Sequence, residues 1–92
     1  MRQPPGADNI TATQNALSTA AEAIFSVRPS RHRAVIKNID TSITVYVGET
    51  VDVTSATGLP LAAGESIALY TTAAIYAIAA SGTPTVALLE EW

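Results

Sequence analysis

The chain has 92 residues, no cysteine and a formal net charge of -3 at pH 7. A domain of this length buries only about 60–65% of the surface that its unfolded chain exposes, and without cysteine neither a disulfide nor a thiolate metal site adds to its stability. We therefore expect it to associate with other chains. The apolar residues are mostly Ala, Val, Ile and Leu in short runs broken by Thr and Ser, a composition typical of β proteins.

Nothing in the chain indicates export or insertion into a membrane. No stretch reaches the roughly 18 uninterrupted apolar residues that a membrane span needs. The N-terminal sequence MRQPPGADN also lacks the apolar centre of a signal peptide. These observations predict a soluble protein that stays in the cell that makes it and has no membrane partner.

Residues 1–19 are predicted to form an extended N-terminal arm, because prolines and a glycine are followed by a polar series rich in Thr, Asn and Gln. A short helix from about Thr13 to Ala23 is the alternative, since Leu17, Ala21 and Ile24 recur at helical spacing. Against the helix, the sequence runs directly into Arg28-Pro29, and a residue before proline favours extended backbone. We therefore predict a strand near residues 21–27.

From residue 33 onward, apolar and polar residues alternate in short runs separated by turn residues. In ITVYVG, for example, Val45 and Val47 share one face while Thr44 and Tyr46 share the other, which indicates a half-buried antiparallel strand. A hairpin is expected to join this strand to the run before it, and Val51 and Val53 are expected to point inward from the next. The predicted strands are 33–39, 43–48, 50–55, 66–71, 74–80 and 85–91, with a loop at 56–65 and a turn at 81–83.

This pattern predicts an all-β fold. Short strands at 8 to 12 residue spacing are typical of a small antiparallel β-sandwich or a jelly-roll-like barrel, here with about six or seven strands. We expect two parts, the arm at residues 1–19 and a β-sandwich domain at residues 20–92.

Four of the five basic side chains lie within ten positions, at Arg28, Arg31, Arg33 and Lys37. One interpretation is an anchor for phosphate or for an acidic protein surface. The other, which we favour, is a solvated turn whose charges keep a strand edge from pairing with other chains. Nucleic-acid binding proteins usually carry a basic excess over the whole domain, so the acidic balance predicts no nucleic-acid partner.

Reactive side chains do not form a recognisable catalytic pattern. His32 lies between two arginines, without a second histidine or a cysteine to complete a metal site, and is interpreted as a solvated turn residue. Glu90 and Glu91 point to opposite faces if they lie on a strand, and a charged chain end is the preferred interpretation. Three acids near one loop, Glu49, Asp52 and Glu65, lack the spacing of a calcium loop. We expect no enzyme activity, no cofactor and no bound metal.

Three stretches, VIKNIDTSITVYVG, GLPLAAGESIAL and IYAIAASGTPTVALLE, resemble a family of small β-rich structural proteins from tailed bacteriophages. In that family, an Arg-led strand ending in Asn precedes a VYVG-type strand, a G-x-P-L-x-A-G-E loop and a closing YAIAASGT hairpin. The resemblance covers about residues 28–90, and residues 1–20 lie outside it. Similar modules occur as head decoration (cement) proteins and as domains of other virion components, and the family carries no catalytic residues.

The resemblance implies a capsid decoration protein, made in the host cytoplasm and located on the capsid surface of the virion. Its partners would be the major capsid protein and further copies of itself, most simply as a trimer, and the arm would lie along the capsid or a sister subunit. The candidate interface residues are Leu59, Pro60, Leu61, Arg28, Arg31 and Arg33. The alternative for the leucines is that they cap the open end of their own sandwich.

Two other roles compete with decoration. A carbohydrate-binding or adhesion module of a tail fibre would use Tyr46, Tyr70 and Thr-rich strand faces as a platform for sugars. A head-tail connector component would form a closed ring of subunits. Because the chain runs from Met1 to Trp92, we expect a stand-alone protein, and this favours decoration over a module of a longer fibre.

Overall fold

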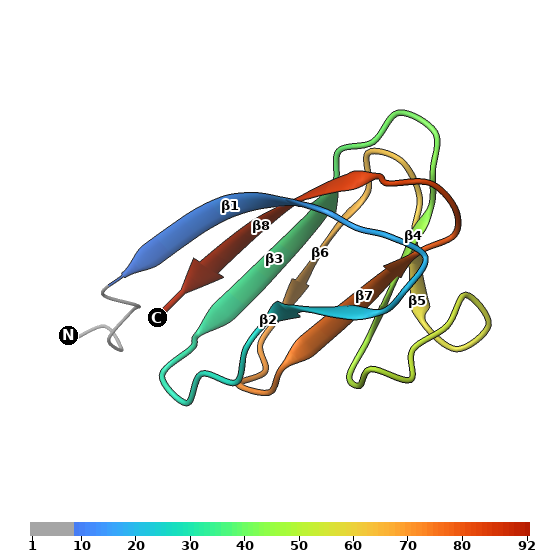
Figure 1. Cartoon of the computed structure of the whole chain (residues 1–92). Coiled ribbons are helices and arrows are strands. Elements are labelled where there is room, and N and C mark those ends of the chain that lie inside the picture. Colours follow the sequence, from blue (N-terminus) through green and yellow to red (C-terminus); the bar gives the residue numbers. More distant parts are fainter. Residues whose placement is uncertain (1–8) are drawn as a thin grey trace, which may run out of the picture.

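The alternating runs of the sequence become eight strands in a computed structural model that describes residues 9–92 (Figure 1). Inward and outward side chains alternate most clearly in three of them, where β-branched and small apolar residues face the core. The strands are β1 Ile10–Ala16, β2 Glu22–Phe25, β3 Arg33–Asn38, β4 Val45–Gly48, β5 Leu59–Leu61, β6 Ser66–Leu69, β7 Ile75–Ala79 and β8 Thr85–Glu91.

The strands form two four-stranded antiparallel sheets that face each other. Sheet A has the order β1-β8-β3-β6, and sheet B has the order β2-β7-β4-β5. Only β4 and β5 are both consecutive in sequence and paired. Every other pair of consecutive strands belongs to opposite sheets, and this strand order is that of an eight-stranded jelly roll. The predicted all-β sandwich is confirmed, with eight strands in place of six or seven.

Three local predictions were wrong, and the topology explains each. The strands around Ile36 and Val45 do not form a hairpin, because β3 lies in sheet A and β4 in sheet B. The YAIAASGT segment is likewise a crossing between sheets, from β7 to β8. Residues 50–55 form a turn-rich loop. Val53 is buried, but it lies against Gly48 on the outer side of sheet B and not in the core between the sheets, and Val51 is 60% exposed.

The sandwich begins earlier than residue 20. Ile10–Ala16 form β1, which pairs along its whole length with β8, so that Ile10 lies opposite Glu91 and Ala16 opposite Thr85. Leu17 follows and is only 1% exposed. The described part of the predicted arm is therefore an edge strand of sheet A, and no helix forms between Thr13 and Ala23. The rest of the predicted arm, residues 1–8, lies outside the described residues.

The core fills the space between the sheets. It consists of aliphatic side chains and one phenylalanine, and each fully buried Leu, Ile or Val contributes about 1.5–3 kcal/mol. Alanines on β3 and β7 keep the sheets close. The core cluster is Leu17, Phe25, Ala34, Ile36, Val45, Val47, Leu61, Ile75, Ala77, Ala79, Val86 and Leu88.

A buried asparagine holds the loops together at one end of the sandwich. Asn38, the last residue of β3, is 0% exposed, and its Nδ2 donates to the carbonyl oxygens of Ile43 and Leu61 at 2.8 and 2.9 Å. Its Oδ1 accepts from the backbone N–H of Asp40. The next turn is fixed by the Asp40 carboxylate, which accepts from the N–H groups of Ile43 and Ser42, and these hydrogen bonds lower the pKa of Asp40.

The described residues contain no helix with the length and apolar character needed to cross a membrane.

Candidate functional site

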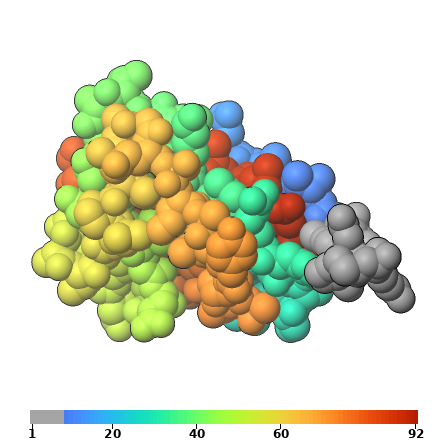
Figure 2. Space-filling model, turned by 180° about the vertical axis from the view of Figure 1, so that it is seen from behind, coloured from blue at the N-terminus to red at the C-terminus, as the bar shows by residue number. Residues whose placement is uncertain are grey.

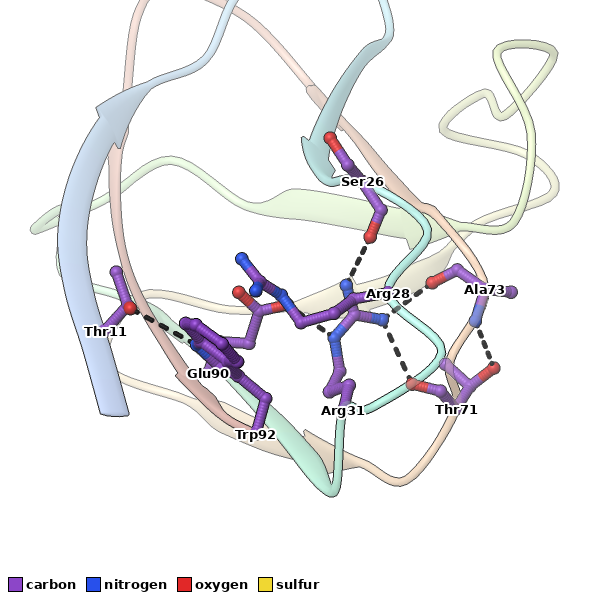
Figure 3. A network of polar contacts seen from close by, with 8 residues as sticks. All are labelled: Thr11, Ser26, Arg28, Arg31, Thr71, Ala73, Glu90 and Trp92. Carbon is purple, nitrogen blue, oxygen red and sulfur yellow. Dashed lines mark hydrogen bonds and ion pairs between the residues drawn. The ribbon is translucent and has the colours of Figure 1, made fainter. Parts of the chain in front are cut away.

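Of the three arginines predicted as interface residues, Arg31 is buried at the centre of a polar network (Figure 3), whereas Arg28 and Arg33 keep part of their surface exposed. Arg31 precedes β3 at the opposite end from Asn38, and its side chain is fully buried. Its Nε donates to Oε2 of Glu90 at 2.7 Å, and its Nη1 donates to the carbonyl oxygens of Thr71 and Ala73 at 3.0 and 2.8 Å. Its Nη2 donates to the carbonyl oxygen of Ser26. Arg31 therefore ties the β2–β3 and β6–β7 connections to β8.

Arg28 lies on the outer side of the same carboxylate. Its Nε is 3.1 Å from Oε2 of Glu90, and its guanidinium lies 4.0 Å from the centre of the Trp92 ring. The Trp92 indole N–H in turn donates weakly to Oγ1 of Thr11 at 3.4 Å. The Arg28 side chain keeps 36% of its surface exposed, so it has surface left for a partner.

The remaining charged residues of this region lie on the surface. Arg33 forms an ion pair with Glu91 and is 43% exposed, while His32 and Lys37 are exposed. Glu90 and Glu91 point to opposite faces, as predicted. Glu90 is buried between two arginines, however, and the interpretation of a plain charged chain end was wrong for it.

The segment Leu59–Leu61, predicted to be a loop, is the short edge strand β5. Leu61 is 4% exposed and belongs to the core, whereas Leu59 is 49% exposed and Pro60 is also exposed. Leu59 borders a hollow together with Val47 and Leu69, on the side where β5 and β6 lie next to each other (Figure 2, yellow to orange). Two of the three predicted contact residues are therefore exposed: Pro60 on the outside of sheet B, and Leu59 at the open edge between the two sheets.

A second apolar surface lies beside β5 on the outside of sheet B, and we call it the aromatic face. It consists of Tyr46, Pro60, Tyr76, Ile78 and Ala23, which the strand register places on one side of the sheet: Pro60 lies opposite Tyr46, Tyr46 opposite Ile78, and Ala23 opposite Tyr76. No strand position facing outward on sheet B carries a charge. The alternation in ITVYVG and AIYAIAA already indicated that these tyrosines point away from the core, but only the strand order brings them together.

Tyr70 lies elsewhere. It follows β6 of sheet A and is 74% exposed, so it does not share a surface with Tyr46, and the predicted sugar platform of these two residues was wrong.

The outside of sheet A carries an apolar row between polar ones. Ala12, Leu89, Val35 and Ala68 lie opposite one another across the four strands. Because two of them are alanines, the row is shallow, and a hollow of about 490 Å³ lies over its β1 side.

The acidic residues considered for a metal do not form a site. Glu49 and Asp52 belong to the β4–β5 loop, whereas Glu65 lies after β5, where its Oε1 accepts from the N–H of Ala62. Within residues 9–92 no three His, Cys, Asp or Glu side chains gather to hold an ion.

The strand order defines the chain as a jelly-roll domain. The outward strand positions of sheet B carry no charge, whereas those of sheet A carry an apolar row flanked by charged residues. No protein-family model and no curated protein sequence matches the chain. Solved structures do match it. The stem and receptor binding domain of the spike protein P1 from bacteriophage PM2 is similar, with a TM-score of 0.67, 17% identity, and 89% of this chain covering 33% of that one.

Two further similar structures are a second one from bacteriophage PM2 and one from a bacterial protein. In the structure of the entire lipid-containing bacteriophage PM2, a chain matches with a TM-score of 0.67 and 17% identity, covering 89% of this chain and 25% of that one. A cupin-2 domain containing protein from Shewanella frigidimarina has a TM-score of 0.61 and 9% identity, with 92% and 72% covered. The chain thus spans only a third or less of the two phage chains. At sequence identities this low, the similarity shows a shared fold and nothing more.

Proposed function

We propose that the chain is a structural module of a bacteriophage virion, and more specifically a non-enzymatic decoration protein on the outside of the assembled head. The aromatic face is the observation that carries the proposal. Its tyrosines are half-buried, so a partner surface would cover it without burying an unpaired charge of the strands, and aromatic residues are enriched at the centres of interfaces. The shared fold with a phage spike domain supports the virion part, and the sequence resemblance to cement proteins supports decoration.

In this mechanism the major capsid protein covers the aromatic face, with Pro60 at its β5 margin, while Leu59 lies at the open edge between the two sheets. Arg28, which follows the edge strand β2 and keeps part of its guanidinium surface exposed, supplies a charged contact beyond the apolar centre. Arg33 faces outward from sheet A, on the other side of the sandwich, and takes no part in this contact. Arg31 and Leu61 contribute indirectly, since both are buried and hold the connections and strands in place. A protein that binds only the assembled shell shifts the assembly equilibrium toward it and so stabilises the head.

Binding to phage heads that lack the protein tests this proposal. We expect saturable binding at symmetry-related positions, seen by imaging, and heads that then resist heating better. The variant Ile78→Glu places a carboxylate in the centre of the aromatic face and should weaken binding at least about tenfold, because the charge would be buried without a partner. The matched control Ala68→Glu, on the outside of sheet A, should bind as the wild type does. No binding of the wild type to the heads would contradict the proposal. Equal binding of Ile78→Glu and Ala68→Glu would contradict it as well.

Adhesion to a host surface is the second candidate, and the likeness to a phage stem and receptor binding domain favours it. On this alternative, Tyr46 and Tyr76 of the aromatic face would stack on sugar rings. Retention of the protein on host glycans, lost in Tyr76→Ser and combined with no binding to heads, would support adhesion over decoration.

A further inference from the structure

Among the described residues, the outer edge of β1 is an open strand edge without the usual protection against pairing. Its sequence ITATQNA has no charged residue, no proline and no glycine, and it runs for seven residues. Within residues 9–92, β1 pairs only with β8. Natural edge strands are usually protected by charges, prolines, bulges or shortness, so a long and neutral edge indicates a pairing site.

The other three sheet edges are protected in these ways. β5 has three residues with Pro60 in the middle, and Pro60 offers no N–H to a further strand. β2 has four residues, one of them Glu22, and its register shifts between Ala23 and Phe25. β6 has only four residues. β1 therefore differs from every other edge of the described sandwich.

The hydrogen-bonding groups of the β1 edge can be assigned from the pairing with β8. The N–H of Trp92 donates to the carbonyl of Asn9, and the N–H of Leu17 donates to the carbonyl of Pro84. Because bonding alternates along an antiparallel strand, the odd-numbered residues bond to β8 and the even-numbered ones direct N–H and C=O outward. The outward groups belong to Ile10, Ala12, Gln14 and Ala16.

We propose that two copies of this chain associate through β1, antiparallel and with their two-fold axis at Thr13. This register places Ile10 opposite Ala16 and Ala12 opposite Gln14, so that all four outward residues pair with one another. The four pairs form about eight backbone hydrogen bonds. The two A sheets become one continuous eight-stranded sheet.

The side chains suit this register. No charge opposes another charge, since β1 carries none. On the inner side Thr13 meets its own copy and Thr11 meets Asn15, residues that hydrogen-bond readily across strands. Thr11, Thr13 and the exposed Val27 line a hollow of about 370 Å³ between β1 and β2. In the proposed dimer, the second copy lies next to the open side of this hollow. The contact is two-fold, whereas the sequence resemblance implied trimers, and it does not depend on the proposed virion role.

Cysteine cross-linking tests the register directly, because the chain has no cysteine of its own. Thr13→Cys places two sulfur atoms across the axis in a non-hydrogen-bonded pair, whose short separation suits a disulfide. We expect mild oxidation to give a covalent dimer at least about tenfold faster than for the exposed control Ala68→Cys on β6. Ala12→Cys should also be slower, because residue 12 faces residue 14 of the partner. Equal rates for all three variants would overturn the proposal.

Sedimentation of the whole protein over a range of concentrations tests the association itself. The wild type should show a monomer–dimer equilibrium. The double variant Ala12→Lys/Gln14→Lys opposes lysine to lysine at the edge and should stay monomeric, whereas Ser66→Lys/Ala68→Lys, with the same added charge on β6, should dimerise as the wild type does. A monomeric wild type, a trimer, or equal association of both double variants would overturn the proposal. Circular dichroism spectra and melting temperatures verify that every variant is folded.

Discussion

At the scale of single residues, Arg31 makes the clearest prediction. Replacing it by alanine leaves Glu90 with only Arg28 and leaves the carbonyl groups of Ser26, Thr71 and Ala73 without their donor. Breaking a buried ion pair from one side is strongly destabilising, and we expect Arg31→Ala to lower the free energy of unfolding by about 3–5 kcal/mol. Urea unfolding measures this loss.

Arg33→Ala is the matched control for Arg31→Ala. Arg33 also pairs with a glutamate of β8, but its side chain is 43% exposed, and surface ion pairs contribute only about 0–1 kcal/mol. Equal losses for the two variants would show that the network around Arg31 does not hold the sandwich end together.

Asn38→Asp makes a prediction about pH. The substitution replaces the amide that donates to Ile43 and Leu61 with a carboxylate facing two carbonyl oxygens at a position 0% exposed. One oxygen keeps the Asp40 N–H as its donor, but the other faces two carbonyl oxygens in a buried position, and this raises the folded-state pKa of the carboxyl above its unfolded value of about 3.9. The variant should therefore approach wild-type stability below about pH 3.9, where the carboxyl is protonated in both states. It should lose stability as the pH rises above this value through the folded-state pKa. Thermal melting from acid to neutral pH measures this, with Asn38→Ala as the variant whose deficit should not follow this course.

At the scale of elements, the β4–β5 loop is held to sheet B by Val53 lying on the backbone of Gly48. A Cβ at residue 48 would come within 2.5 Å of Val53 Cγ2 and 2.7 Å of its Cβ. Gly48→Ala should thus destabilise the fold by about 1–3 kcal/mol. In Gly48→Ala/Val53→Ala the clash disappears, so the double variant should lose less than the sum of the two single variants. Strictly additive losses in chemical denaturation would contradict this packing.

The elements also show how far the sequence predicts the structure. β3, β7 and β8 alternate clearly because one face of each is buried against the opposite sheet, and they were found within a residue or two. β1 was missed because Thr11 and Thr13, which face inward, are still exposed, so its sequence carries no apolar alternation. β5 was missed because Pro60 is unfavourable in strands except at an edge, and the sequence does not indicate which strand is the edge.

The sequence predicted the candidate site only in part, because it does not indicate which strands pair. The sequence indicated that Tyr46 points outward and that Pro60 suits a contact. It could not place Tyr76 and Ile78 beside these two residues, because that depends on the pairing of β4 with β7. Nor could it distinguish Arg31 from Arg28 and Arg33. All three lie within one short polar segment, and only the closing of the β6–β7 connection over Arg31 buries it.

At the scale of the whole molecule, the jelly roll joins the two ends of the described chain, and this should make folding slow. β1 pairs with β8, and β8 also pairs with β3, so sheet A forms only when residues distant in sequence meet. We expect refolding in about milliseconds to seconds, as for other folds dominated by non-local pairing. Trp92 is the only tryptophan, and it lies against Arg28 and Thr11 only when β1 and β8 are paired.

Stopped-flow refolding followed by Trp92 fluorescence and by far-UV circular dichroism tests this expectation. Because β8 is an inner strand of sheet A, the two signals should change together in one phase. Arg28→Ala serves as the control, since it removes the cation beside the indole and should change the fluorescence amplitude more than the rate. A fluorescence change that is complete well before the circular dichroism change would mean that the chain ends pair before the sheets form.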